Sequence, residues 1–582
     1  MPKQKSWFSS VSSKVRPLFL ELVVYSFFIN ILALVIPLFV LQVYNRVVAF
    51  GNISTLQGLI AGVLIALLFD FLLRQIRSRL LQKAAMRIDI SLGETVMKKF
   101  WALPLRIMES RPGVYWQGVF RDVDTVRNTI AGPPFLLLID LPFAGIFIVL
   151  IFIIAEPIAW VFVSIVPVFI LLALISGKLV GRASADEKKD QRSRDSLVGD
   201  MINSRGTVKA LSLDAGIAPY WEHVQSTNIE SAMKRGMTHD GFINLGTVFT
   251  LGTTAIITTF GALAIIDQQL SIGALIAANM LSNRVIGPFS QLVGAWKNFT
   301  AYKQSRDRLD EVMNLSVERT AQTIQLDRPT GTLVLEKVSF KYTEDGEFVL
   351  ENLSANFASN AVHMIMGPNG GGKSTLIKLM KGLYIADQGR ILIDGGDITQ
   401  FTRKQLTAWI GYVPQETVLI DGTIKENISG KRDYITDEEV VAVCTKVGIH
   451  KTITDFPDGY ATNVGEAGRS LSGGVRQRIA IARALIGEPP ILIFDEPSAS
   501  LDRFAEIQLK GLLQALSESC TIIVVSHSPV LLGVTSYLHL LDKKNIIISG
   551  PKDEVLQALE KRPKNEAPVE KGDVNGSARV GA

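Results

Sequence analysis

A glycine-rich stretch in the second half of the chain has the residue types and spacing to bind phosphate. It fits the pattern G-x-x-x-x-G-K-[ST] and consists of Gly367, Pro368, Asn369, Gly370, Gly371, Gly372, Lys373, Ser374 and Thr375. An apolar run typical of a buried strand precedes it, and a helical pattern follows it. In that context backbone N–H groups converge on phosphate oxygens, and the helix N-terminus adds partial positive charge. Lys373 would reach the β- and γ-phosphates of a nucleotide, and Ser374 would bind Mg²⁺.

A glycine-rich turn could match this pattern by chance, so the prediction needs support from other residues. An apolar run at 491–494 ends in two carboxylates, Asp495 and Glu496. Asp495 suits Mg²⁺, and Glu496 can polarise an attacking water as a general base. A capped loop is the alternative explanation for such a strand end. Tyr342 precedes the glycine-rich stretch at a distance where its ring could stack on an adenine, although it could equally be an ordinary surface tyrosine.

Three further motifs, together with the residues after Glu496, complete a recognisable set. They are Ser472, Gly473 and Gly474 within 471–478, Gln415 at the end of 411–415, His527 at the end of 522–527, and 500–502. In this order over residues 333–555, the motifs resemble those of ATP-binding cassette (ABC) proteins. The resemblance implies that Gln415 is the glutamine-loop residue, a further metal and ATP contact, and that His527 is the switch histidine.

The resemblance also implies a dimer. In the family, the signature residues Ser472, Gly473 and Gly474 contact a γ-phosphate held by the other subunit's phosphate loop, so that two ATP molecules lie between two cassettes. Residues 462–466 resemble the loop specific to exporters. Two positions depart from the family pattern. Val475 replaces the usual Gln and Gly371 the common Ser, and we expect activity to survive both because backbone groups make the main contacts.

The first half of the chain indicates a membrane domain. The chain has 582 residues, too many for one core, and 48% of them are hydrophobic, with a mean hydropathy of +0.27. Six apolar stretches are long enough to cross a bilayer: 18–44, 56–73, 134–154, 158–176, 242–266 and 272–292. The expected fold is therefore an all-α transmembrane domain followed by an α/β P-loop domain.

The basic residues indicate a topology. Segment 74–130 carries 11 Lys and Arg and segment 178–240 carries 10, whereas 45–56 has only Arg46. By the positive-inside rule, both long segments and both termini lie in the cytoplasm of a multi-pass protein. The net charge of +5 is then mainly a topology signal, and a nucleic-acid partner is not expected.

The two long segments read as helical pairs that extend beyond the membrane. Their tips, 103–108 and 214–221, are predicted to be short docking helices, with ordinary helix–helix turns as the alternative. Asp140 stands within the third span and is either functional or locally paired. Asp70 and Arg74 are spaced for a local helix pair.

The expected domain order starts with a polar segment at 1–17, either a short interfacial helix or a frayed terminus. A membrane domain follows at 18–310, a linker at 311–330, a nucleotide-binding domain at 331–560 and a disordered tail at 561–582. The two cysteines, Cys444 and Cys520, indicate neither a disulfide framework nor a metal cluster.

Three stretches resemble type I secretion ATPases in particular: 37–47, 139–143 and 422–428. The resemblance implies a homodimer in the bacterial inner membrane that works with a periplasmic adaptor and an outer-membrane channel to export an unfolded protein. Only 17 residues precede the first span, which favours relatives without an N-terminal peptidase-like domain, such as exporters of proteases, lipases and adhesins. A lipid, glycolipid or drug exporter is the alternative. An ATP-gated channel or regulatory sensor is disfavoured because Glu496 and His527 are present.

Overall fold

The computed structural model describes residues 7–318 and 328–560, and these form two compact units. The helical unit comprises Met1–Leu103 and Ser110–Ser316. The α/β unit comprises Pro104–Glu109 and Val317–Ala582. The boundary at 316/317 falls within the predicted linker. Part of that linker and the predicted tail at 561–582 lie outside the described residues.

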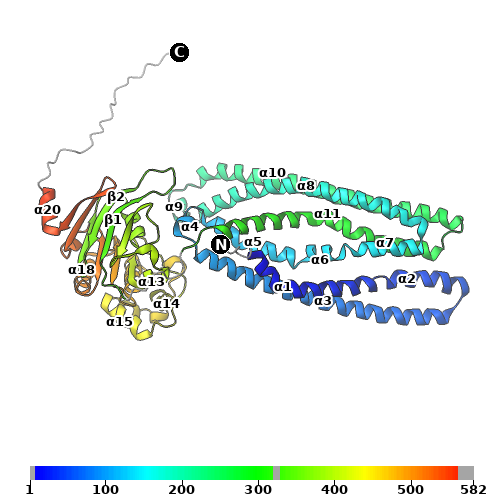
Figure 1. The fold of residues 1–582 in the computed structure, drawn as a ribbon, viewed down its shortest axis with the longest axis horizontal. Helices are drawn as coiled ribbons and strands as arrows, with labels where there is room; N and C mark the ends of the chain where they lie inside the picture. The colour runs from blue at the N-terminus through cyan, green and yellow to red at the C-terminus, as the bar shows by residue number, and fades with distance from the viewer. Residues whose placement is uncertain (1–6, 319–327, 561–582) are drawn as a thin grey trace, which may run out of the picture. The chain divides into compact units, whose positions relative to one another are not determined.

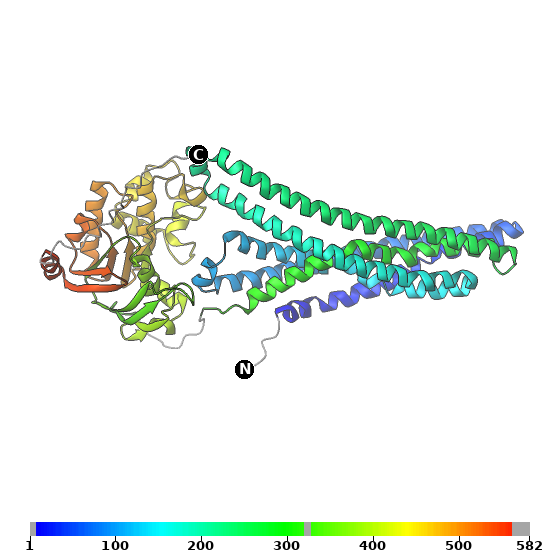
Figure 2. The ribbon, with the colours of Figure 1, turned by 90° about the horizontal axis from the view of Figure 1, so that it is seen from above.

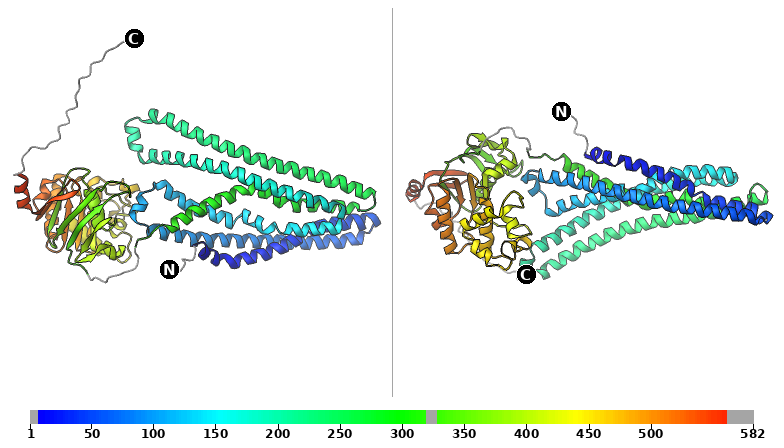
Figure 3. Two further views of the ribbon diagram at one scale, coloured as in Figure 1. Left: turned by 45° about the horizontal axis from the view of Figure 1, so that its top comes forward. Right: turned by 90° about the horizontal axis from the view of Figure 1, so that it is seen from below.

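The helical unit is all-α, as expected (Figure 1). Its helices are α1 (Trp7–Leu32), α2 (Val35–Gln42), the π-helical turn η1 (Val43–Val48), α3 (Ile53–Trp101), α5 (Gly113–Ile130), α6 (Pro133–Asp140), α7 (Phe143–Ile154), α8 (Glu156–Asn203), α9 (Arg205–Ala210), α10 (Asp214–Ile266) and α11 (Ile272–Asn314). Figure 2 shows α8 and α10 running side by side, and Figure 3 shows the same of α1 and α3. Both long excursions are helical pairs, as predicted. The 49-residue α3 is about 74 Å long, more than twice a bilayer core of about 30 Å.

Five helical runs among the described residues are long and apolar enough to cross a membrane: Val15–Val48, Ile53–Trp101, Gly113–Ile154, Glu156–Asn203 and Asp214–Ile266. They contain the first five predicted spans. The sixth predicted span, 272–292, lies on α11. This helix is less apolar than the other five runs, so the sixth span stays a prediction. Asn279, Asn283, Arg284 and Gln291 account for the difference.

The expectations for two short segments need correction. The chain is helical from Trp7 onward and runs into the first span without a break, so 7–17 are part of α1. The segment 214–221 is also not a separate docking helix, because it forms the first turns of the 53-residue α10. Pro219 is the sixth residue of α10 and lies inside the helix, which continues past it. The chain reverses instead at Ser212, whose φ of 49° is left-handed, and the short helix at this tip is α9.

Polar side chains from three helices meet at Asp140. The Asp140 carboxylate accepts from Arg77 Nη1 at 3.2 Å and from Asn30 Nδ2 at 3.1 Å. Arg77 also donates to Ser26 Oγ at 3.1 Å. Asp140 is therefore paired, although with α3 and α1 rather than within its own helix. By contrast, Asp70 forms the predicted local pair with Arg74, at 2.7 Å.

The α/β unit contains two sheets. The first is antiparallel, with strand order β2-β1-β4-β5, and the second has the order β10-β9-β3-β8-β7-β6. The strands are β1 (Leu333–Phe340), β2 (Leu350–Phe357), β3 (Val362–Met366), β4 (Gln388–Ile393), β5 (Gly396–Asp397), β6 (Ile410–Val413), β7 (Ile491–Asp495), β8 (Thr521–Val525), β9 (Tyr537–Asp542) and β10 (Asn545–Pro551). In the second sheet β9, β3, β8, β7 and β6 are parallel, and their near-continuous apolar sequences bury both faces.

Helices cover this sheet on its two sides. They are α4 (Leu105–Glu109), α12 (Lys373–Met380), η2 (Ile398–Gln400), α13 (Arg403–Trp409), α14 (Ile424–Ser429), α15 (Asp437–Val447), α16 (His450–Thr454), η3 (Gly459–Ala461), η4 (Glu466–Gly468), α17 (Gly473–Leu485), α18 (Arg503–Leu516), α19 (Pro529–Leu532) and α20 (Lys552–Glu560). One apolar core lies between the sheet and α14, α15, α17 and α18, and the other lies between the sheet, α12, α13 and the antiparallel strands. Cys444 and Cys520 are buried and free, as predicted.

Two buried histidines link β3 to β9. His363 Nε2 lies 2.9 Å from the Ala358 carbonyl and must carry the proton of that bond. His363 Nδ1 therefore accepts from His539 Nε2 at 3.1 Å, and His539 Nδ1 accepts from the Ser549 hydroxyl at 2.8 Å. The chain of bonds needs both rings neutral. Burial lowers the pKa of His363 and lowers that of His539 to about 3.

The Asp140 cluster predicts a stability loss. Asp140→Ala should destabilise the protein by on the order of 3 kcal/mol, because it leaves the Arg77 guanidinium half-buried without its counter-charge. Thermal unfolding in detergent measures the effect. Asp70→Ala, which removes the more exposed local pair, is the matched control and should cost about 0.5 kcal/mol or less. Equal losses in the two variants would contradict the assigned role of Asp140.

The histidine pair predicts acid sensitivity. Both pKa values lie below the unfolded value of 6.5, so the unfolded chain binds protons that the folded chain excludes. Stability from this pair is complete above pH 6.5 and decreases as the pH falls towards 3. Melting temperatures at pH 7.5 and 5.5 should therefore differ less for His539→Gln than for wild type. The exposed His223→Gln is the control and should keep the wild-type difference.

Candidate functional site

Four strand ends bring the predicted site residues together. In the register of the parallel sheet, Ile365 of β3 and Asp495 of β7 both pair with Val525 of β8, and Val413 of β6 pairs with Phe494. The segments that follow these strands must therefore emerge at one edge. They carry the glycine-rich loop, Asp495 with Glu496, His527 and Gln415. Gln415 is exposed two residues beyond β6.

The glycine-rich loop has the shape that a phosphate cradle needs. Gly370 and Gly372 adopt left-handed φ values of 76° and 94°. A Cβ on Gly372 would also lie 2.9 Å from Leu350, so a side chain there meets both strain and a clash. Lys373 starts α12, and its ammonium donates to the Gly367 and Pro368 carbonyls at 2.8 and 3.0 Å. The loop is therefore formed with its cation folded over it.

His527 lies between Lys373 and the candidate general base, Glu496. Lys373 Nζ lies 3.5 Å from His527 Nε2, which in turn lies 3.9 Å from Glu496 Oε1. Glu496 has a left-handed φ of 45°, and its N–H donates to the Val525 carbonyl at 2.8 Å. A non-glycine residue in this conformation costs free energy, and the hydrogen bond to Val525 helps to hold Glu496 there. Glu496 and His527 therefore lie close to each other and to Lys373 of the phosphate loop.

Asp495 is the most buried charge at the site, with 4% of its surface exposed. Its pKa is raised to about 6, mainly by burial and next by the neighbouring Glu496, while Lys373 and a hydrogen bond from Ser374 act to lower the pKa. A carboxylate in this position favours a bound cation. Asp495, the Ser374 hydroxyl and the amide oxygen of Gln415 supply the hard oxygen ligands that Mg²⁺ prefers, so these residues fit the ion. Mg²⁺ there would neutralise charge on the phosphates.

Tyr342 lies beside this loop with its ring partly exposed. Its hydroxyl is 2.8 Å from Thr375 Oγ1, and its ring packs edge-on against Phe340 and Tyr384. These contacts fix the tyrosine at the rim of the phosphate loop. The position agrees with the adenine-stacking role expected from the sequence, which remains a prediction.

The predicted docking segment at 103–108 does contain a short helix, α4, and it belongs to the α/β unit. Arg106 donates to the Tyr342 carbonyl at 2.9 and 3.1 Å and pairs with Asp387 at 3.5 Å. Glu109 accepts from Lys378 of α12 at 3.0 Å and from the Tyr384 hydroxyl. Docking thus joins α4 to both the aromatic rim and the phosphate-loop helix. No sequence signal identified Lys378, Tyr384 or Asp387 as its partners, because their spacing from α4 follows no local pattern.

The signature residues lie at the start of α17. Ser472 is its N-cap and accepts from the Val475 N–H at 3.4 Å, and a Cβ on Gly474 would lie 3.4 Å from the Ser500 carbonyl. Within the described chain, no hydrogen bond joins Ser472, Gly473 or Gly474 to the phosphate loop. The Val475 side chain is buried in the core, so the departure from Gln changes an inward-facing side chain while the backbone N–H still caps the helix.

A buried amide behind the signature was missed from the sequence. Gln477 is 3% exposed, and its Oε1 accepts from Thr417 Oγ1 at 2.7 Å. Thr417 follows Gln415 by two residues, so this bond ties the glutamine loop to α17. The Gln477 Nε2 has no hydrogen-bond partner among the described residues. The sequence of α17 mixes polar and apolar residues, and this pattern does not indicate that the polar side chain of Gln477 faces the core.

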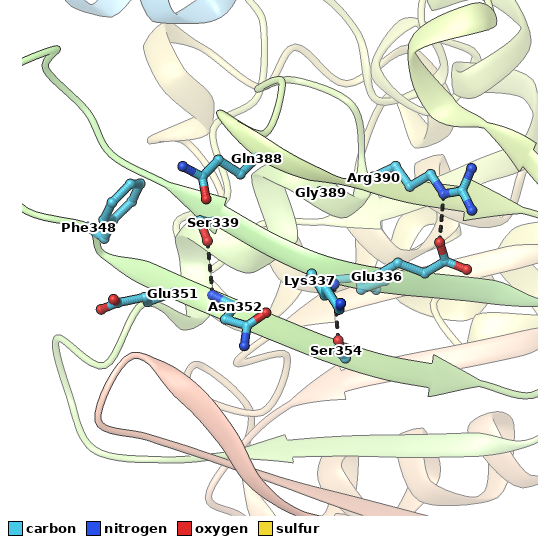
Figure 4. A pocket seen from close by; sticks show the side chains of 11 residues that line it. Glu336, Lys337, Ser339, Phe348, Glu351, Asn352, Ser354, Gln388, Gly389 and Arg390 are labelled. Atoms are coloured by element: carbon cyan, nitrogen blue, oxygen red, sulfur yellow. Dashed lines mark hydrogen bonds and ion pairs between the residues drawn. The ribbon is translucent and has the colours of Figure 1, made fainter.

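A separate cavity lies away from the strand edge. It occupies about 890 Å³ on the antiparallel sheet and is lined by residues that include Glu336, Lys337, Asn352 and Arg390 (Figure 4). Glu336 and Arg390 pair at 2.6 Å across it. None of the predicted site residues lines it. We therefore assign the nucleotide chemistry to the strand edge.

Comparisons with known proteins support this assignment. The ABC transporter model matches residues 350–499, and the ABC transporter transmembrane region model matches 19–289. The leukotoxin translocation ATP-binding protein LktB of a Pasteurella haemolytica-like species is 30% identical over 554 residues, covering 95% of this chain and 78% of that protein. The leukotoxin export ATP-binding protein LtxB of Aggregatibacter actinomycetemcomitans is 29% identical with the same coverage.

The fold has a solved counterpart. A bacterial Atm1-family ABC exporter with ATP bound superposes with a TM-score of 0.82 at 22% identity, covering 95% of this chain and 99% of that one. This likeness concerns the fold, and the relatives above carry the family. The chain therefore belongs to the ABC transporter family, as a half-transporter whose membrane domain precedes one ATPase domain, homologous to the leukotoxin export proteins.

Proposed function

We propose that the chain is the ABC transporter of a type I protein secretion system and exports a polypeptide across the bacterial inner membrane. The observation that carries the proposal is similarity over 95% of the chain to proteins named for leukotoxin export. A periplasmic adaptor and an outer-membrane channel are its expected partners. By the positive-inside rule, the basic segments support a cytoplasmic location for both termini.

Hydrolysis of ATP at the strand edge follows from the residues present. Lys373 and the loop N–H groups bind the phosphates, and the ring of Tyr342 stacks on the adenine. Glu496 accepts a proton from the attacking water. His527 lies within reach of both Lys373 and Glu496, and it positions the γ-phosphate of ATP. Ser374, Asp495 and Gln415 are the proposed Mg²⁺ ligands.

The proposed working form is a homodimer. The exposed Ser472 caps α17 away from the phosphate loop, and its hydroxyl and the following glycines leave a helix N-terminus open to an anion. The nucleotide bound to a second copy of the chain would supply that anion. Two ATP molecules then close the interface, and α4 carries the movement through the chain into α3 and α5.

A lipid, glycolipid or drug exporter would share every ATP-site residue, so the site alone does not separate these functions. The relatives favour a protein cargo. A channel or sensor without turnover is disfavoured, since Glu496 sits in a strained conformation that a non-hydrolytic site has no reason to keep.

Glu496→Gln tests the function and the chemistry together. Without a general base, phosphate release by the purified protein should fall by about 10²-fold or more, while ATP binding in a filter assay stays near wild type. In the native host, the variant should lose a specific polypeptide from the culture medium, as seen by mass spectrometry. Unchanged phosphate release would refute the base, and an unchanged secretome with altered membrane lipids would refute protein secretion.

Arg106→Ala tests the role of α4. It removes the bonds to Tyr342 and Asp387, each hydrogen bond to the charged group contributing about 1.5–3 kcal/mol. Transport per ATP hydrolysed should fall several-fold, with basal hydrolysis within about twofold of wild type, since no catalytic group is touched. Arg111→Ala, which breaks a pair with Glu311 inside the helical unit, is the control. Coupling lost equally in both variants would contradict a specific role for Arg106.

A further inference from the structure

The exposed faces of the membrane helices differ in character. On α3 and α8 the exposed side chains at membrane depth are large and apolar, among them Leu64, Phe71 and Leu174. Such faces suit lipid. Between residues 273 and 300 of α11 the exposed side chains are Asn283, Arg284, Gln291, Lys297 and Asn298.

Most of these residues form one continuous face. Asn283, Gly287, Gln291, Gly294 and Asn298 recur at three- or four-residue intervals, and Arg284 adjoins the first of them. Arg284 lies about 18 Å along the helix from Ile272, close to half of a hydrocarbon core of about 30 Å. A charged side chain and a row of amides at that depth are costly against lipid and almost always face a water-filled or protein-filled space.

Arg284 has no ion pair among the described residues. Two carboxylates of other membrane helices are already engaged, because Asp70 pairs with Arg74 and Asp140 pairs with Arg77. The exposed guanidinium of Arg284 is therefore available to a carboxylate of a bound molecule.

The surrounding polar groups match a polypeptide. A cavity of about 420 Å³ between α5, α6 and α11 is lined in part by Asn128, Gln291 and Asn298. Nearer the other end of the face, Asn279 donates to Thr258 at 3.4 Å, while its buried Oδ1 has no hydrogen-bond partner among the described residues. Side-chain amides both donate and accept, as peptide groups do, so they can exchange hydrogen bonds with an extended backbone.

We infer that this face of α11 lines the route of the exported polypeptide and that Arg284 selects segments carrying carboxylates. The inference rests on the proposed secretion function and goes beyond it by assigning a specificity-determining residue. Arg284 forms charge-assisted, forked hydrogen bonds with Asp or Glu side chains of the cargo, and the uncharged amides hold its backbone without fixing its sequence.

Three peptides test the assignment. They are unstructured Gly/Ser peptides that carry Asp, Asn or Lys at the same positions, with a fluorescent label, titrated against the purified full-length dimer in nanodiscs. Wild type should bind the Asp peptide about tenfold or more tightly than the Asn peptide. Arg284→Gln should abolish that difference, Arg284→Glu should invert it towards the Lys peptide, and Arg284→Lys should keep most of it.

Matched controls separate the charge from general damage. Lys297→Gln, also an exposed cation on α11, should bind like wild type, and basal ATP hydrolysis should be unchanged in all four variants. A photocrosslinking residue at Asn283 should capture the Asp peptide, whereas one at the lipid-facing Leu174 should not.

Different failures point to different conclusions. If none of the three peptides binds wild type, the secretion function fails. If peptides bind but the preference for Asp is absent or survives in Arg284→Gln, the function stands and the role of Arg284 is overturned. Dissociation of the dimer by Arg284→Gln in light scattering would also overturn it, since Arg284 would then be a subunit contact.

Discussion

Burial of the Asp495 carboxylate is the constraint on which the site depends. A charge that is 96% withdrawn from water, next to a second carboxylate, has a pKa near 6 and needs positive charge around it. Lys373 and Ser374 supply part of that compensation, and both belong to the first turn of α12. Two features hold these groups at one edge of the sheet. They are the left-handed glycines of the loop and the parallel register of β3, β8 and β7. A nucleotide bound here with the proposed Mg²⁺ would supply the rest of the positive charge that the Asp495 carboxylate needs.

The same edge is tied mechanically to two remote segments. Arg106 bonds to the carbonyl of Tyr342, and Glu109 bonds to Lys378 of α12. One short helix, α4, therefore contacts both the aromatic rim and the helix that follows the phosphate loop. Thr417 and Gln477 attach the glutamine loop to the helix that starts at Ser472. The rim of the phosphate loop is therefore connected to α4, and the glutamine loop to the start of α17, through few, short, polar contacts. Short connections of this kind favour concerted movement over gradual deformation.

The sequence predicted much of this because local rules sufficed. The phosphate loop, the strand that ends at Asp495 and the capped start of α17 are each encoded by a few consecutive residues, and the structure has them where expected. What failed were boundaries that depend on longer context. A short docking helix was expected at 214–221, but these residues begin the long helix α10, and the chain turns before them at Ser212, which has a left-handed φ. The partners of Asp140, Glu109 and Gln477 come from distant segments, and a single sequence carries no signal for them.

The two cysteines have a consequence for the conditions under which the protein works. Both are free and buried, and burial raises the pKa of each thiol to about 11. The thiolate is the form that reacts with oxidants and disulfides, and at neutral pH only about one molecule in 10⁴ carries it at either position. Cys444 and Cys520 are therefore expected to stay reduced in the folded protein, because neither offers an oxidant a reactive thiolate.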